Sequence, residues 1–86
     1  MASELEKIRE NPFVVGTKQT LKAVKNGIAV TVFLAEDASD YMRNQVSEVC
    51  GKYGMSVEHV STMEQLGNSC GISRGAVTAA IIKKII

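Results

Sequence analysis

Ile28–Ala35 has the sequence IAVTVFLA, an almost unbroken apolar run rich in β-branched residues. A strand with one wet face alternates apolar and polar residues, whereas a central strand covered on both faces is apolar throughout. Asn26-Gly27 precedes the run and Glu36-Asp37 follows it, and these residue types are depleted in strands. The run therefore predicts a central strand whose sheet has helices packed on both sides.

Helices and strands alternate on either side of this run. Apolar residues at helical spacing, such as Leu21 and Val24, alternate with short β-branched runs such as Phe13–Val15. We expect further strands over residues 13–15, 56–60 and 77–82, and helices over residues 3–10, 17–25, 39–53 and 61–70. With helical crossovers between strands, this order predicts an α/β fold, a three-layer α/β/α sandwich with a four-stranded sheet. The sheet can be mixed or mostly parallel, and we favour a mixed sheet.

Local signals mark the ends of these helices. Ser3-x-x-Glu6 and Ser61-x-x-Glu64 have the form of capping boxes, and Thr17 is the candidate N-cap of the second helix. Glycines are expected to stop three helices, at positions 27, 54 and 71.

Size and composition limit the class of protein. The 86 residues are enough for one domain with one core, and 45% of them are hydrophobic. No window approaches the roughly 18 apolar residues of a membrane span, so we expect a cytoplasmic protein without a membrane segment. Cys50 and Cys70 lack the CxxC spacing of a zinc site, and His59 is the only histidine. We expect two buried thiols, a half-exposed histidine in a strand, no metal site and no cofactor.

The formal net charge of +1 hides a segregated pattern. Residues 11–35 contain lysines but no acid, and residues 65–86 contain Arg74, Lys83 and Lys84 but no acid. If the two acid-free segments lie side by side, they form a basic face of the kind that binds a polyanion. The alternative is an ordinary solvated lysine surface.

The turn before the second helix has the equipment of an anion site. Lys18, Lys22 and Lys25 stand at helical spacing on one face, and the free N–H groups of the first turn point to the same place as Lys18. Gly16 allows a ligand to approach the backbone, and Gln19 can both donate to and accept from a base. A capped helix with solubilising lysines would have the same pattern. The turn lacks the GxxxxGK[ST] and GxGxxG patterns of nucleotide-binding loops.

A second candidate is the loop Cys70-Gly71-Ile72-Ser73-Arg74-Gly75. Ile72 can cover an unstacked base, while Ser73 and Arg74 can hold phosphates, a combination suited to RNA. The alternative is a plain helix-to-strand connection with Ile72 in the core.

Three motifs, in the same order and spacing, resemble the kink-turn-binding ribosomal protein family of the L-seven-Ae type, particularly its short bacterial members. They are Gly16-Thr17-Lys18-Gln19-Thr20-x-Lys22-Ala23 with Gly27, Ala35-Glu36-Asp37, and Leu66-Gly67-x-x-Cys70-Gly71-Ile72-Ser73-Arg74. The resemblance spans nearly the whole chain, and the family fold is an α/β/α sandwich.

The resemblance implies a single RNA-binding domain over residues 1–86 that recognises kink-turns, sharply bent RNA elements with tandem sheared G·A pairs, in ribosomal or riboswitch RNA. It places the RNA contacts at the helix head and in the second loop, with a monomer as the expected state. The implied RNA-binding residues are Gly16, Thr17, Lys18, Gln19, Lys22, Ile72, Ser73 and Arg74.

Four positions depart from the family pattern. Archaeal and eukaryotic members have Asn-Glu at the position of Lys18-Gln19, and some members have Glu and Lys at the positions of Ser39 and Met63. These changes predict a different preference among kink-turns.

Two other functions fit parts of the same sequence pattern. One is a ribosome-associated scaffold that contacts ribosomal RNA without sequence preference. The other is an enzyme that uses Glu36-Asp37, at the end of a strand, as an acidic pair. No nucleophile and base accompany that pair at a recognisable spacing, so we expect no catalytic residues and no enzyme activity.

Overall fold

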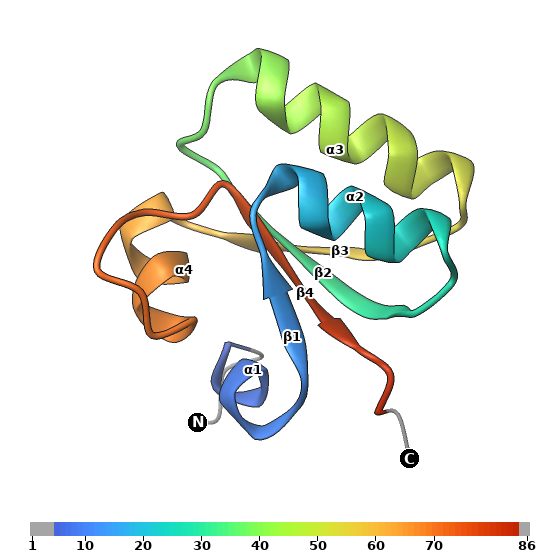
Figure 1. Cartoon of the computed structure of the whole chain (residues 1–86). Helices are drawn as coiled ribbons and strands as arrows, with labels where there is room; N and C mark the ends of the chain where they lie inside the picture. The colour runs from blue at the N-terminus through green and yellow to red at the C-terminus, as the bar shows by residue number, and fades with distance from the viewer. Residues whose placement is uncertain (1–4, 85–86) are drawn as a thin grey trace.

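The computed structural model describes residues 5–84, which form four helices and four strands in alternation (Figure 1). The helices are α1 (Glu6–Glu10), α2 (Thr17–Lys25), α3 (Asp40–Lys52) and α4 (Met63–Ser69), and the strands are β1 (Phe13–Val15), β2 (Ala29–Ala35), β3 (Val57–Val60) and β4 (Thr78–Ile82). Every strand predicted from the sequence is present within one residue of its expected bounds.

The sheet is mixed, as predicted. Its strand order is β1-β4-β2-β3, with β4 antiparallel to both β1 and β2, and β3 parallel to β2. The apolar run thus forms an interior strand, paired on both sides. The strand is buried except at Val30, which is 54% exposed, and at the partly buried Thr31, where the pairing with β4 shifts register.

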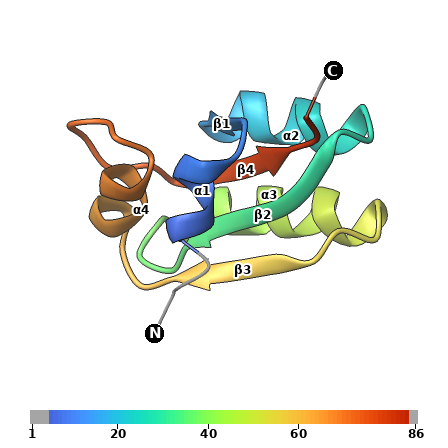
Figure 2. The same ribbon diagram turned by 90° about the horizontal axis from the view of Figure 1, so that it is seen from below.

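The sheet separates two layers of helices, α2 and α3 on one face and α1 and α4 on the other (Figure 1; Figure 2). Successive side chains of a strand point to opposite faces. Val32 and Leu34 therefore pack under α2 and α3, while Phe33 packs with Ile8 and Leu66 from α1 and α4. Covering both faces of β2 explains why its sequence is apolar at consecutive positions, and the predicted α/β/α sandwich is confirmed.

Two of the predicted helix caps are wrong by one residue. Gly16, not Thr17, is the N-cap of α2, because the N–H of Gly16 is bonded to β4 and its carbonyl accepts the first helical hydrogen bond, from Thr20. The N-cap of α4 is Thr62 rather than Ser61, since the hydroxyl of Thr62 accepts from the N–H of Gln65. Ser3 lies outside the described residues, and α1 begins at Glu6 with Leu5 as its N-cap.

Cys50 and Cys70 are buried free thiols, as predicted, one in each core layer. Burial raises the pKa of both thiols, and at Cys70 the charge of Arg9 opposes part of that rise. Within residues 5–84, no group of His, Cys, Asp and Glu could hold a metal ion, and no helix is long and apolar enough to cross a membrane.

Candidate functional site

The two predicted recognition segments meet at one end of the sheet. Because β1, β2 and β3 all run antiparallel to β4, they end where β4 begins, and we call this the carboxyl end of the sheet. There the N–H of Gly16 donates to the carbonyl of Thr78, with an N···O distance of 2.9 Å. A hollow of about 360 Å³ lies between the segments and is lined by Val15, Gly16 and Thr17 on one side and by Ile72, Arg74, Gly75, Ala76 and Val77 on the other.

The head of α2 is open to an anion. Gly16 adopts φ 102° and ψ 154°, a backbone conformation that residues other than glycine rarely adopt. No side chain caps the helix, and its first turn contains no acidic residue. The free N–H groups of that turn and the positive end of the helix dipole thus face solvent beside the hollow.

The predicted polar side chains of α2 are exposed around this head. Lys18, Gln19 and Lys22 are all exposed, and Thr17 is partly buried at the rim of the hollow. Lys18 lies on the side of α2 that faces α3, Gln19 lies on the side of β1, and Lys22 borders both sides. Together they present donors and an amide over the width of the helix.

The second loop is held against α4 by its backbone. The carbonyl of Gly67 accepts from Ile72 N–H at 3.1 Å, and the carbonyl of Met63 accepts from Ala76 N–H at 3.0 Å. A Cβ added at Gly67 would lie only 2.0 Å from the carbonyl oxygen of Arg74, so the loop rests directly on a surface that a glycine leaves free. Backbone contacts to α4 therefore help to fix the place of the loop.

The side chains of the second loop divide between core and surface. Ile72 is partly buried and packs against the core layer of α1 and α4, yet it also lines the hollow. Ile72 thus has the core contact expected of a plain helix-to-strand connection, while its role in covering a base stays a prediction. Arg74 is exposed and lines the hollow, whereas Ser73 is exposed but does not line it.

Two further residues, Asp37 and Arg9, position the loop in roles that the sequence did not reveal. The carboxylate of Asp37 accepts from the N–H of Met63 at 2.7 Å, which fixes the start of α4. The guanidinium of Arg9 donates to the carbonyls of Asn68 at 2.9 Å and Ser69 at 3.2 Å, which fixes its end. Both contacts join residues far apart in sequence, so no local pattern marks them. Gly67 did carry a signal, because a glycine inside a helix is unfavourable unless close packing requires it.

The predicted basic face forms only in part. Arg74 lies beside the head of α2, but Lys83 and Lys84 follow the other end of β4, where the N–H of Lys83 bonds the carbonyl of Ile28. The full length of β4 separates them from the hollow. The acid-free segment at the end of the chain therefore contributes only Arg74 to the candidate site.

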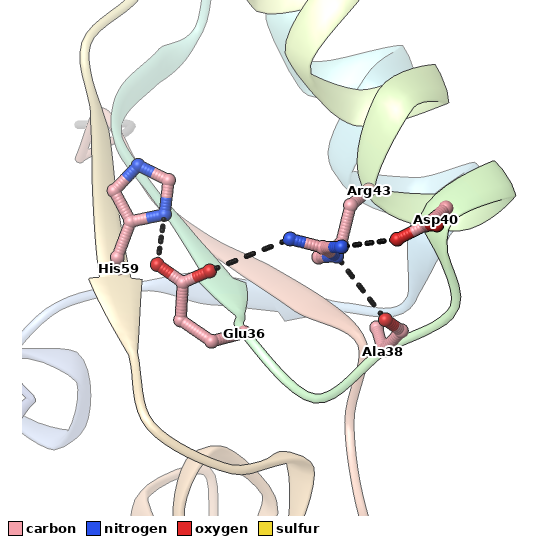
Figure 3. A network of polar contacts seen from close by, with 5 residues as sticks. All are labelled: Glu36, Ala38, Asp40, Arg43 and His59. Atoms are coloured by element: carbon pink, nitrogen blue, oxygen red, sulfur yellow. Dashed lines mark hydrogen bonds and ion pairs between the residues drawn. The ribbon is translucent and has the colours of Figure 1, made fainter.

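Glu36 and Asp37 both have structural partners. Glu36 bonds the Nδ1 atom of His59 at 2.8 Å and approaches Arg43 at 3.7 Å, as Figure 3 shows. Arg43 also pairs with Asp40 and donates to the carbonyl of Ala38 at 3.2 Å, which closes the loop between β2 and α3. His59 lies in β3 with its side chain 55% exposed, as predicted for a half-exposed strand residue. This network secures the head of α3 at the carboxyl end of the sheet.

The chain is similar to known proteins along most of its length, and over residues 2–85 it matches the Ribosomal protein L7Ae/L30e/S12e/Gadd45 family. A relative from Caldanaerobacter subterraneus named as an RNA-binding protein is 45% identical over 67 residues, covering 78% of this chain and 82% of the relative. RNA-binding protein YbxF from Geobacillus stearothermophilus is 36% identical over 76 residues, covering 88% of this chain and 93% of the relative.

A ribosomal protein and a solved structure extend the comparison. Large ribosomal subunit protein eL8 from Halobacterium salinarum is 37% identical over 68 residues, which cover 78% of this chain and 57% of that protein. A solved structure of a protein with unknown function from Bacillus halodurans superposes with a TM-score of 0.77 and 26% identity, covering 92% of this chain and 77% of the other. The chain therefore belongs to the Ribosomal protein L7Ae/L30e/S12e/Gadd45 family.

Proposed function

We propose that this protein is a non-enzymatic RNA-binding protein that recognises kink-turns and stabilises their bent form. The observation that carries the proposal is the uncapped, acid-free head of α2 beside the loop from Ile72 to Arg74, with a hollow between them. A bent RNA offers two surfaces to one small protein, so a site made of two adjoining parts suits it. The names of the bacterial relatives, and the family to which the chain belongs, support RNA as the ligand.

Each part of the site has a chemical role in this proposal. The first-turn N–H groups of α2 and the charge of Lys18 bind phosphate or the acceptor atoms of a guanine edge. Gln19 supplies an amide that both donates and accepts, and Lys22 adds a phosphate contact one turn further on. Ile72 offers an apolar surface to a nucleobase that the bend has unstacked, while Ser73 and Arg74 bind the backbone next to it.

Stabilisation of the bend requires preferential binding to it. A protein shifts RNA between an extended and a kinked form only by the difference in its affinities for the two. The fixed loop meets this need, because backbone contacts to α4 hold Ile72 and Arg74 at a set place relative to α2. In this proposal an extended duplex contacts either the head of α2 or the loop, whereas the bent RNA contacts both at once.

The test is a binding titration of two RNA duplexes, one with a kink-turn and one in which Watson–Crick pairs replace its G·A pairs. We expect clear preference for the kink-turn and an affinity that falls steeply with salt, as phosphate contacts require. Lys18→Gln and Arg74→Gln should weaken binding of the kink-turn, whereas the matched control Lys84→Gln, at the other end of β4, should not. Equal affinity for both duplexes would refute specific recognition and favour a scaffold with non-specific RNA contacts.

A further inference from the structure

A second surface continues from the head of α2 and shares Lys18 and Lys22 with the site described above, but extends beyond it along α3. It is a groove of about 600 Å³ between α2 and α3, which lie side by side on one face of the sheet (Figure 1). Lys18, Lys22 and Lys25 line it from α2, and Gln45 lines it from α3. Leu21, only 8% exposed, lies between the lysines and gives the groove an apolar floor.

The groove is cationic because the acids near its α3 wall are paired elsewhere. None of the residues that line it is acidic. Of the acids near the head of α3, Glu36 and Asp40 both bind Arg43, with Glu36 also bound to His59 (Figure 3), and Asp37 accepts from the N–H of Met63. Three lysines without an acid among them match an anionic ligand in charge.

An exposed aromatic side chain stands at the head of the α3 wall. Tyr41 is 74% exposed and lies one turn before Gln45, so the two share a face of α3. Arg43 comes two residues after Tyr41 and therefore lies about 200° around the helix from it. The acids that pair with Arg43 thus lie on another side of α3 than Tyr41. Because α2 and α3 both begin at the carboxyl end of the sheet, Tyr41 lies at the end of the groove that adjoins the proposed RNA site.

We propose that this groove binds a short single-stranded RNA segment that leaves the kink-turn held at the head of α2. One base of the segment stacks on Tyr41, and its phosphates pass along Lys18, Lys22 and Lys25. Cationic grooves with an aromatic platform are the common device for binding single strands without sequence preference, because every base has a face to stack. The inference rests on the proposed function and adds a second class of RNA feature, a flanking single strand.

The geometry limits the segment to a few nucleotides. Lys18 and Lys25 are separated by about 10 Å along the axis of α2, at 1.5 Å per residue. Beyond Gln45 the α3 face turns acidic at Glu48, which lines a separate hollow with Val49 and Lys52. An RNA strand is therefore favoured only along the first turns of α3, next to the kink.

The experiment compares a blunt kink-turn duplex with the same duplex bearing a short single-stranded extension, placed at each strand end in turn. We expect the extension at one end to tighten binding to the wild-type protein by about fivefold or more, as one stacked base would. Tyr41→Ala should remove this gain and leave affinity for the blunt duplex unchanged, while Tyr41→Phe should keep it. Lys25→Gln should reduce the gain. Tyr53→Ala is the matched control, since Tyr53 is the other exposed tyrosine and lies at the far end of α3.

A second readout reports stacking directly. A 2-aminopurine base in the extension should lose fluorescence when the wild-type protein binds, and should lose much less with Tyr41→Ala. If the wild-type protein gains nothing from any extension, or if Tyr41→Ala weakens both duplexes equally, the groove proposal is wrong while kink-turn binding stands. In that case the α2–α3 face is left for a protein partner. If the blunt kink-turn itself binds no better than its Watson–Crick control, the proposed function fails first.

Discussion

Replacement of Gly67 by alanine tests whether the second loop is placed by its contact with α4. The new Cβ would lie 2.0 Å from the carbonyl oxygen of Arg74, 3.0 Å from its carbonyl carbon and 3.2 Å from the Cα of Gly75. These neighbours are backbone atoms, so relief requires the loop to move by at least about 1 Å. Movement of that size strains the hydrogen bonds by which the N–H groups of Ile72 and Ala76 hold the loop to α4.

Two opposing effects set the size of the stability change in Gly67→Ala. Overpacking a tight site costs about 1–3 kcal/mol, whereas alanine in a helix is favoured over glycine by about 0.8–1 kcal/mol. We therefore expect the free energy of unfolding to fall by up to about 2 kcal/mol, with a fall in melting temperature of about 4–8 °C for each kcal/mol. Affinity for a kink-turn should fall about tenfold, the equivalent of one lost contact of about 1.4 kcal/mol.

Gly51→Ala is the matched control. Gly51 also lies in a helix, but a Cβ there meets no atom within 4 Å, so the substitution should stabilise the fold by up to about 1 kcal/mol and leave RNA binding unchanged. Urea titrations give the stability of both variants, and RNA titrations are then made at a temperature where both are folded. A Gly67→Ala protein as stable as Gly51→Ala, with wild-type affinity, would refute the role of this contact.

Four further outcomes are expected. Thr17→Asp should stabilise α2 by about 0.3–1 kcal/mol through the helix dipole while it weakens RNA binding, with Thr17→Asn as the uncharged control in both assays. Thr20 is fully buried and its hydroxyl has no partner among the described residues, so Thr20→Val should raise the free energy of unfolding by about 1 kcal/mol in urea. Asp37→Ala should cost about 1 kcal/mol, since the N–H of Met63 loses its acceptor, and hydrogen exchange should then speed up at the start of α4. Burial raises the pKa of both thiols, so the unfolded chain loses these protons at a lower pH than the folded chain does. Stability measured by thermal melts should therefore fall as the pH rises above the ordinary thiol pKa of 9.0. A double Cys→Ala variant should lose this dependence of stability on pH.

The elements were predictable because their signals are local and strong. The run Ile28–Ala35 predicted an interior strand, and the structure pairs it on both sides and covers both of its faces. The caps of α2 and α4 were each misplaced by one residue, at Thr17 and Ser61. At α2 the deciding fact is the bond from Gly16 to Thr78, which depends on strand order and leaves no trace near Gly16 in sequence.

The assembly of the site was only partly predictable, because it too depends on the strand order, which the local sequence does not show. Motif order indicated two recognition segments, but their meeting across one hollow follows from β1 pairing with β4. The same pairing sends Lys83 and Lys84 to the far end of β4, so counting charges along the chain overstated the basic face. Asp37 and Arg9, which fix α4 from either end, act across 26 and about 60 residues and could not be recognised without the fold.

The three helices that begin at the carboxyl end of the sheet differ in how their heads are satisfied, and the difference bears on function. Ser39 caps α3 beside Asp40, and Thr62 together with Asp37 caps α4. The head of α2 has Gly16 as its N-cap and so lacks both a capping side chain and an acid, which forgoes about 1 kcal/mol that a serine or aspartate normally contributes. A capping carboxylate there would occupy the same N–H groups that a phosphate needs, so stability and anion binding compete at this position. The opposite signs expected for Thr17→Asp, more stable but weaker in RNA binding, follow directly from that competition, whereas a head that is merely unoptimised would gain stability without losing affinity.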